Sequence, residues 1–230
     1  MSQIANNWNR VKERVAEASL RSGRNPEVVK IIAVSKTFPG EYIKEAVEAG
    51  VTIIGENRIQ EAWQKYQQVG RIASWHLIGH LQTNKVKRAL QIFDFIHSVD
   101  SLHLAEEISR RCVQMNKDVE ILLEVKTTDE PTKFGINPEN TIELAQKISS
   151  LPHLMLTGLM TISKFTAIEK EVRECFQLLR QTKDLLNDCD DFHSKIHHLS
   201  MGMSNDFEWA IEEGSTMVRI GTLIFGQRTS

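Results

Sequence analysis

The sequence predicts an α/β fold, a TIM-type (β/α)8 barrel with an extra helix at its N-terminus. Two observations support it. A short apolar run, a polar turn and an amphipathic helix recur about eight times along almost the whole chain. Eight such units close a barrel, whereas an open doubly wound sheet usually stops nearer five or six strands. No linker rich in proline, glycine or serine interrupts the chain, so we expect residues 1–230 to form a single domain.

The extra helix is expected over residues 4–22, because apolar residues recur there at intervals of three and four among charged ones. Residues 30–40, KIIAVSKTFPG, supply the first strand, whose unbroken apolar run is typical of a parallel strand covered on both faces. With a period of two, Lys36 shares the inward face of this strand with Ile32 and Val34. Lys36 therefore either extends its ammonium into solvent or, once desolvated, serves as a nucleophilic amine that forms a Schiff base. The strand alone does not decide between the two.

The later units follow the same order, each strand leading into a helix. The first strand is followed by a helix at 41–50, and a last strand at 216–221 runs into a short tail. The six predicted pairs between them are 51–55 with 56–68, 74–79 with 83–91, 94–99 with 101–115, 119–125 with 137–150, 153–160 with 165–186, and 195–200 with 205–214. Functional groups in such barrels gather where the strands end, so the residues at those ends are the candidates for a site.

The end of the seventh strand predicts an anion site. It reads LSMGMSNDFE, where Ser200, Gly202 and Ser204 bring small side chains and an approachable backbone to the start of a helix. The free N–H groups at a helix N-terminus attract phosphate. Asn205 and Glu208 also fit a capping box, which explains those two residues without any ligand.

The end of the eighth strand, MVRIGT, points to the same pocket. Arg219 faces the barrel interior, Gly221 lets a ligand approach the backbone, and Thr222 adds a hydroxyl. The loops after strands seven and eight form the recurrent phosphate site of this fold. Because a closed barrel places its last strand beside its first, Lys36 becomes a neighbour of that site. A lysine for an aldehyde, a cradle for a phosphate and an arginine for a ring nitrogen together suit pyridoxal 5'-phosphate.

These residues lie within longer motifs that resemble a known family. The motifs are AVSKT, GENRIQE, WHLIGHLQTNK, KFGI, GLMTI, LSMGMSNDFEWAI and GSTMVRIGTLIFG, and they cover nearly the whole chain. They are similar to the pyridoxal phosphate homeostasis proteins, also called the YggS or PROSC family. That family looks like the barrel domain of alanine racemase standing alone, and it binds the cofactor without an established enzymatic turnover.

The resemblance implies a role for each residue of the site. Lys36 matches the Schiff-base lysine and Arg219 matches the arginine that faces the pyridine nitrogen. Asn57 matches a residue on the ring side of the pocket. The matches to the phosphate contacts are Ser200, Gly221 and Thr222. The chain departs from the family pattern at Arg58 and His80, where an aromatic residue and a proline are frequent, and both departures concern the rim of the pocket.

The resemblance also implies a function, that of holding pyridoxal phosphate and buffering or delivering it to pyridoxal phosphate-dependent apoenzymes. Two alternatives use the same lysine: an amino-acid racemase and a cofactor-free aldolase. An arginine at the ring nitrogen weakens the electron sink that a racemase needs. The only tyrosines, Tyr42 and Tyr66, lie in predicted helices, so no second base is evident, and no residues remain for a second domain. An aldolase of this kind would be colourless.

The composition disfavours several other classes of protein. Basic and acidic residues are balanced at 28 and 30 without long runs, so we expect no nucleic-acid partner. No segment approaches the roughly 18 apolar residues that span a bilayer, and the N-terminus lacks the apolar stretch of a signal peptide. Three widely spaced cysteines suit a reducing compartment. We therefore expect a cytoplasmic protein without a membrane partner, and a monomer because no second domain would complete a site across a dimer.

The remaining polar candidates have simpler interpretations. His76 and His80 are four residues apart, but the strand pattern gives them no metal-binding geometry, so no metal site is expected. Glu124 and Asp129, near the fifth strand, could act as acid and base. Carboxylates at loop ends are usually solvated, which is the interpretation we prefer for both.

Overall fold

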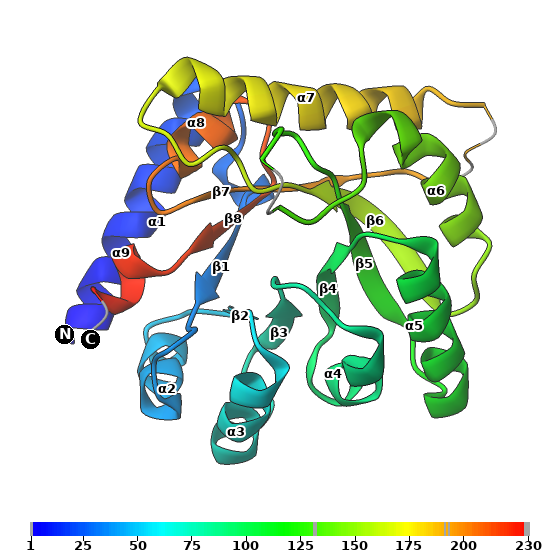
Figure 1. Cartoon of the computed structure of the whole chain (residues 1–230). Coiled ribbons are helices and arrows are strands. Elements are labelled where there is room, and N and C mark those ends of the chain that lie inside the picture. The colour runs from blue at the N-terminus through cyan, green and yellow to red at the C-terminus, as the bar shows by residue number, and fades with distance from the viewer. Residues whose placement is uncertain (1, 131–132, 191, 193, 228–230) are drawn as a thin grey trace.

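Eight parallel strands form the centre of the molecule. The structure, a computed structural model, describes residues 2–130, 133–190, 192 and 194–227. Its strands pair in chain order from β1 to β8, and β8 closes the barrel onto β1. The helices surround this barrel, as Figure 1 shows. The predicted TIM-type barrel is confirmed.

The strands are short and the helices that separate them are longer. The strands are β1 Lys30–Val34, β2 Ile53–Glu56, β3 Ser74–Leu77, β4 Phe95–Val99, β5 Val119–Glu124, β6 Leu154–Met160, β7 His198–Met203 and β8 Met217–Ile220. The α-helices are α1 Gln3–Arg21, α2 Gly40–Glu48, α3 Ile59–Val69, α4 Val86–Ile92, α5 Leu102–Met115, α6 Thr141–Ser149, α7 Glu169–Asn187, α8 Phe207–Glu212 and α9 Thr222–Phe225. Single 3-10 turns are η1 Pro26–Val28, η2 Thr83–Lys85 and η3 Pro138–Asn140.

Strand β7 begins three residues later than predicted, at His198 rather than at residue 195. The preceding Ile196 is as apolar as a strand residue, but its N–H donates to the side chain of Asn187, the last residue of α7, so it pairs with a helix end. Strand pairing with β6 starts only at His198. A short helix, α9, replaces the predicted tail after β8. Both differences arise from tertiary pairing, which local sequence patterns do not report.

The predicted N-terminal helix is confirmed as α1, which packs outside the barrel. Its apolar stripe, including Trp8 and Val15, is buried. It lies against α8 and α9, the two short helices that follow β7 and β8 (Figure 1). Arg14 also pairs with Glu208 of α8 at 2.9 Å. The extra helix therefore supports the part of the barrel from which the predicted phosphate residues come.

Two apolar clusters hold the barrel together. The larger fills the space between strands and helices. The smaller lies inside the barrel and consists of Ile32, Phe95, Leu122, Met160 and Met217. Strand pairing places polar residues on the same inward face, because His76 is level with Phe95 and Arg219 is level with Ile32. The barrel interior is therefore partly polar, which is costly unless every polar group has a partner.

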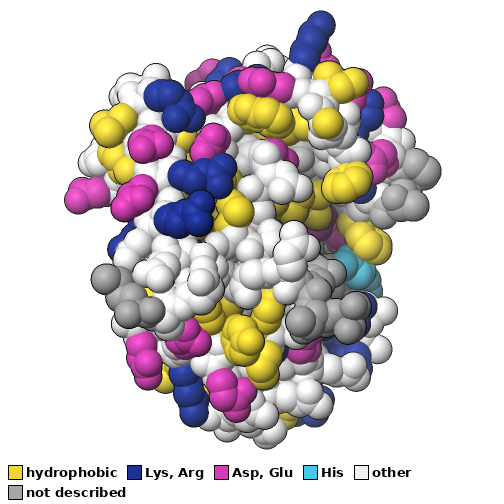
Figure 2. Space-filling view, turned by 90° about the vertical axis from the view of Figure 1, so that its left-hand side faces the viewer, with side chains coloured by type: hydrophobic (Ala, Val, Ile, Leu, Met, Phe, Trp, Pro, Cys, Tyr) yellow, Lys and Arg dark blue, Asp and Glu magenta, His cyan; other side chains and the backbone are white. Residues whose placement is uncertain are grey.

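The surface carries charges of both signs. On the face shown in Figure 2, lysines and arginines alternate with acidic side chains. No helix in the described part of the chain is long and apolar enough to cross a membrane. Within the same residues, no group of three or more histidine, cysteine, aspartate or glutamate side chains could hold a metal ion.

Candidate functional site

Lys36 lies in the turn between β1 and α2, two residues beyond the end of the strand. The predicted strand alternation therefore does not extend to Lys36, and its side chain is half-buried. The next residue, Thr37, has a φ of 72°, a left-handed conformation that β-branched residues rarely adopt. Such a conformation persists only where the surroundings enforce it, and it is common at binding sites.

A buried ionic network holds both residues that flank Lys36. We call it the lysine clamp; its members are Ser35, Glu56, Glu61 and Lys65. Lys65 Nζ donates to Glu56 Oε1 and to Glu61 Oε1, each at a distance of 2.6 Å, and to the Ser35 carbonyl at 2.7 Å. The Ser35 hydroxyl also donates to Glu56 Oε1, and the Thr37 N–H donates to Glu61 Oε1. The clamp thus fixes the backbone of the turn through its side chains.

The lysine clamp contains fully desolvated charge. Glu56 is completely buried, and Lys65 is only 5% exposed. Burial raises the pKa of Glu56, and the charge of Lys65 opposes that rise. Glu56 Oε2 has no hydrogen-bond partner among the described residues. Sequence reasoning missed this network; the four-residue spacing of Glu61 and Lys65 on α3 was its only local signal.

Arg219 confirms the predicted inward orientation, and it is held by neutral acceptors. It is 5% exposed. Its Nη1 donates to the Ser200 carbonyl and to Ser200 Oγ, and its Nη2 donates to the Thr161 carbonyl. Each of the three distances is 2.7 Å. These three bonds leave Nε–H and one Nη2–H without a partner among the described residues. Burial lowers the pKa of Arg219 to about 10, so the side chain stays charged at neutral pH.

Two buried histidines extend the contacts of Arg219 across the barrel. Nδ1 of His97 lies 3.0 Å from Ser200 Oγ, and Nε2 of His97 lies 2.9 Å from Nδ1 of His76. The His76 ring stacks on Phe95 with 4.9 Å between ring centroids. Burial lowers the pKa of His76 to about 3 and lowers that of His97 well below its usual value. Both rings are therefore neutral near pH 7.

The residues predicted to hold phosphate occupy two different environments. Gly221 and Thr222 lie together after β8, and Thr222 is exposed. A Cβ at Gly221 would come within 3.3 Å of the Val34 carbonyl, so Gly221 is beside the end of β1. Ser200 is completely buried, with its hydroxyl engaged by Arg219 and His97. Ser204, at the end of the same strand, instead accepts a hydrogen bond from the Gly221 N–H at 3.3 Å.

Comparison of the amino-acid sequence with known proteins identifies the family of this chain. The family model for the alanine racemase N-terminal domain matches residues 1–229. The pyridoxal phosphate homeostasis protein of Aquifex aeolicus is 44% identical over 95% of this chain and 96% of its own length. The protein of the same name from Escherichia coli strain K12 is 39% identical, covering 99% of this chain and 98% of its own. This chain belongs to the pyridoxal phosphate homeostasis protein family.

A solved structure of a relative agrees with this assignment. PipY of Synechococcus elongatus, described as having pyridoxal phosphate bound, is 36% identical with a TM-score of 0.84. The match covers 97% of this chain and all of the PipY chain, 100%. The barrel predicted from the repeated strand–helix units is thus shared with a solved structure of the family.

Asn57 of this family member lies directly after β2, as the GEN motif predicts. Its Oδ1 is buried and has no hydrogen-bond partner among the described residues. Its backbone is tightly packed, because a Cβ on Gly79 would come within 2.4 Å of the Asn57 carbonyl. Asn57 is therefore an immobilised residue with an unsatisfied acceptor.

Glu124 is buried, whereas the sequence predicts a solvated carboxylate at the end of a loop. It closes β5, it is only 5% exposed, and it lines a cavity of about 220 Å³ together with Thr161 and residues 125–128. Burial and the charge of Asp100 raise the pKa of Glu124 to about 7, against the opposing charge of Arg219. The preferred interpretation of Glu124 is wrong because β5 carries this residue into the polar barrel interior.

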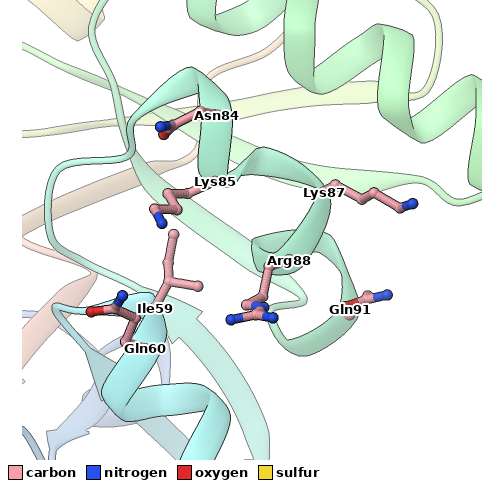
Figure 3. A pocket seen from close by; sticks show the side chains of 7 residues that line it. All are labelled: Ile59, Gln60, Asn84, Lys85, Lys87, Arg88 and Gln91. Carbon is pink, nitrogen blue, oxygen red and sulfur yellow. The ribbon is translucent and has the colours of Figure 1, made fainter.

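A second hollow, of about 450 Å³, lies outside the barrel between α3 and the start of α4. Figure 3 shows that Lys85 reaches toward Ile59, whereas Lys87 and Gln91 point away from it. Arg88 stacks on Trp63, with its Cζ 5.2 Å from the ring centroid. These cations do not converge on one point, and the hollow contains none of the predicted site residues.

Proposed function

We propose that this protein binds pyridoxal 5'-phosphate on Lys36 and buffers or delivers it to apoenzymes, without turnover of its own. The names of its full-length relatives and the description of PipY support this role. The observation that carries it is Arg219, a buried cation with three N–H groups anchored on neutral acceptors and two that have no partner within the described part of the chain. A guanidinium prepared in this way suits a neutral acceptor such as a pyridine nitrogen.

The residues present fit the cofactor. Pyridoxal phosphate supplies an aldehyde carbon that reacts reversibly with primary amines. Lys36 provides such an amine from a turn whose backbone is fixed on both sides by the lysine clamp. Arg219 donates toward the ring nitrogen, and Asn57 offers its unsatisfied Oδ1 on the ring side. The seam between β8 and β1 brings these elements together.

The phosphate is held, in this proposal, by the loop after β8 and by Ser204. Gly221 contributes its backbone N–H and Thr222 its exposed hydroxyl. Ser204, which the sequence places in the same anion site as Ser200, is a member of the cradle because its hydroxyl lies at the Gly221 N–H. Ser200, predicted as a phosphate contact, would serve the phosphate only by giving up its bonds to Arg219 and His97.

Retention of the cofactor, rather than turnover, follows from the charge of Arg219. Its pKa of about 10 keeps the proton on the guanidinium at neutral pH, so the ring nitrogen beside it stays unprotonated. An unprotonated ring nitrogen is a weaker electron sink, and a weak sink disfavours removal of the α-proton of an amino acid. Release to an incoming amine needs no such proton removal.

A visible absorbance spectrum of the purified, reconstituted protein tests the attachment. We expect a band that is lost in Lys36→Ala and kept in Lys44→Ala, which removes an exposed lysine of α2. Borohydride reduction followed by peptide mass spectrometry should place the added mass on Lys36. A wild-type protein that stays colourless after reconstitution would refute cofactor binding.

Turnover is tested separately by incubating the loaded protein with amino acids in deuterated water. We expect no α-proton exchange above that of free cofactor. Sustained exchange that disappears in Lys36→Ala would show an enzyme and overturn the storage and delivery role, while leaving cofactor binding intact.

A further inference from the structure

A line of hydrogen-bonded side chains crosses the barrel interior from Arg219 to His76. Its links are Arg219 Nη1 to Ser200 Oγ at 2.7 Å, Ser200 Oγ to His97 Nδ1 at 3.0 Å, and His97 Nε2 to His76 Nδ1 at 2.9 Å. The four residues come from β8, β7, β4 and β3, and each is at most 5% exposed. The line therefore joins four separate strands inside the barrel.

The chemistry of its first member fixes the direction of every bond in the line. Arginine has only donors, so Ser200 Oγ must accept from Arg219. Among the described residues, the only remaining partner of the Ser200 hydroxyl is His97 Nδ1, so the hydroxyl proton points there. A His97 ring that accepts at Nδ1 carries its proton on Nε2 and donates to His76 Nδ1. His76 is then also protonated on Nε2.

We propose that His97 and His76 are positioning residues for Arg219, and that this one-way line of donors fixes the guanidinium for the ring nitrogen of the cofactor. The proposal rests on the proposed function, since a ring nitrogen is present only when the cofactor binds. It adds two residues that contact neither the lysine nor the phosphate cradle, and it assigns both histidine tautomers.

The line matters because Arg219 has no carboxylate at hydrogen-bond distance among the described residues. Its position depends on neutral acceptors, and one of them, Ser200 Oγ, accepts only while its proton points elsewhere. His97 Nδ1 draws that proton away and polarises the hydroxyl, which strengthens its acceptor side. Without that nitrogen, the buried hydroxyl lacks an acceptor and turns its proton toward the guanidinium, which loosens the anchor.

The tautomers are measured directly by two-bond 15N–1H correlation spectra of the histidine rings in the full chain. The spectra are recorded without added cofactor near neutral pH, and signals are assigned with His76→Gln and His97→Gln. We expect both rings to be neutral, protonated on Nε2, with Nδ1 as a bare acceptor. A proton on Nδ1 of His97 would overturn the proposal, because Ser200 would then receive two donors.

Two substitutions of His97 separate positioning from packing. In His97→Asn the side-chain oxygen can take the place of Nδ1 and still accept from Ser200. In His97→Gln the amide reaches the place of Nε2 and leaves Ser200 without an acceptor. We expect pyridoxal phosphate affinity to fall at least about tenfold in His97→Gln and in Ser200→Ala, and to stay within about threefold of wild type in His97→Asn.

The control is His103→Gln, which changes an exposed histidine of α5 and should leave affinity unchanged. Equal losses in His97→Asn and His97→Gln, or no loss in either, would overturn the positioning role. Circular dichroism establishes that each variant is folded, and the wild-type tautomers decide the matter where a variant does not fold. If the wild-type protein fails to bind cofactor, the proposed function fails, whereas the tautomers still show whether the line exists.

Discussion

Lys36 and Arg219 are held in one barrel by networks of opposite character. The lysine clamp is ionic: Lys65 pairs with two carboxylates, and the clamp grips the backbone on both sides of Lys36. The network around Arg219 is built from a hydroxyl, two carbonyls and two neutral imidazoles, and it grips the guanidinium itself. The centre of each network is buried, at Glu56 and Lys65 in one and at Ser200 and His97 in the other, so exposure to solvent does not explain the difference.

The difference follows from what each residue must do. For the aldehyde attachment proposed at Lys36, a backbone fixed on both sides of the residue holds the amine in a constant position. A guanidinium that only donates can be anchored through its own N–H groups, provided that two of them stay free for the ligand. A carboxylate on Arg219 would compete for those two groups. Neutral anchors thus preserve binding capacity.

The largest effect is expected from removing the cation of the lysine clamp. Lys65→Met leaves the fully buried Glu56 without its counter-ion, and the free energy of unfolding should fall by about 3–5 kcal/mol. The matched control is Lys147→Met, because Lys147 meets Glu143 at the same 2.6 Å distance but on the surface. That change should cost less than about 1 kcal/mol. Urea unfolding measures both, and similar losses would show that the clamp is not an energetic feature.

The charge state of Glu124 decides whether the arginine side is truly neutral. Its pKa is raised from 4.5 to about 7, so the folded state holds the proton more tightly than the unfolded chain does. Ionisation of Glu124 then destabilises the fold, and this stability is lost as pH rises through about 7. Glu124→Gln should therefore gain up to about 3 kcal/mol relative to wild type between about pH 5 and about pH 8.

Unfolding free energies of the two proteins across that pH range test the prediction. Taking the difference cancels the opposite contribution of the buried histidines, whose lowered pKa values remove stability in acid. A difference independent of pH would mean that Glu124 is charged when folded, and the arginine side would then be ionic as well.

A smaller loss of stability is expected from removing the cation of the arginine side. Arg219→Met abolishes the desolvation cost of a buried charge and leaves neutral acceptors unpaired at hydrogen-bond distance, with Glu124 and Asp206 losing only a more distant positive charge, so unfolding should cost about 1–3 kcal/mol less. Affinity for pyridoxal phosphate should fall at least about tenfold, as measured by absorbance titration. Arg71→Met, an exposed arginine paired with Asp94, is the control for loss of an arginine. A stability loss as large as that of Lys65→Met would contradict the contrast between the two networks.

The smallest effect concerns the turn of Lys36. Thr37→Gly relieves a β-branched residue held at positive φ, and the free energy of unfolding should rise by up to about 1 kcal/mol. The same change frees the backbone next to Lys36, so cofactor affinity should weaken. Thr37→Asn, which tolerates that conformation, should keep the affinity better. Unchanged binding in Thr37→Gly would show that the clamp positions Lys36 without help from the strained residue.

The sequence predicted the parts of this molecule that depend on local pattern. About eight apolar runs, each followed by an amphipathic helix, identified the barrel, and the period of two within the last strand predicted that Arg219 faces inward. Lys65 and Glu56 belong to different elements, so their pairing became visible only once α3 packed on β2. His97 lies within the strand FIHSV, and nothing in that short sequence indicates that its side chain has a buried polar partner. Buried networks join distant segments, and no local spacing reports them.

The seam between β1 and β8 has a consequence for how the cofactor enters. Lys36 is synthesised early in translation and Arg219 near its end. The proposed pocket, which needs both residues, is therefore complete only when β8 pairs with β1. A cofactor that contacts both strands then stabilises their pairing, because a ligand that binds only the closed barrel raises the free energy needed to separate β1 from β8. Release of the cofactor would therefore lower the stability of the closed barrel. In the protein without cofactor, we expect local unfolding to begin at the first and last strands.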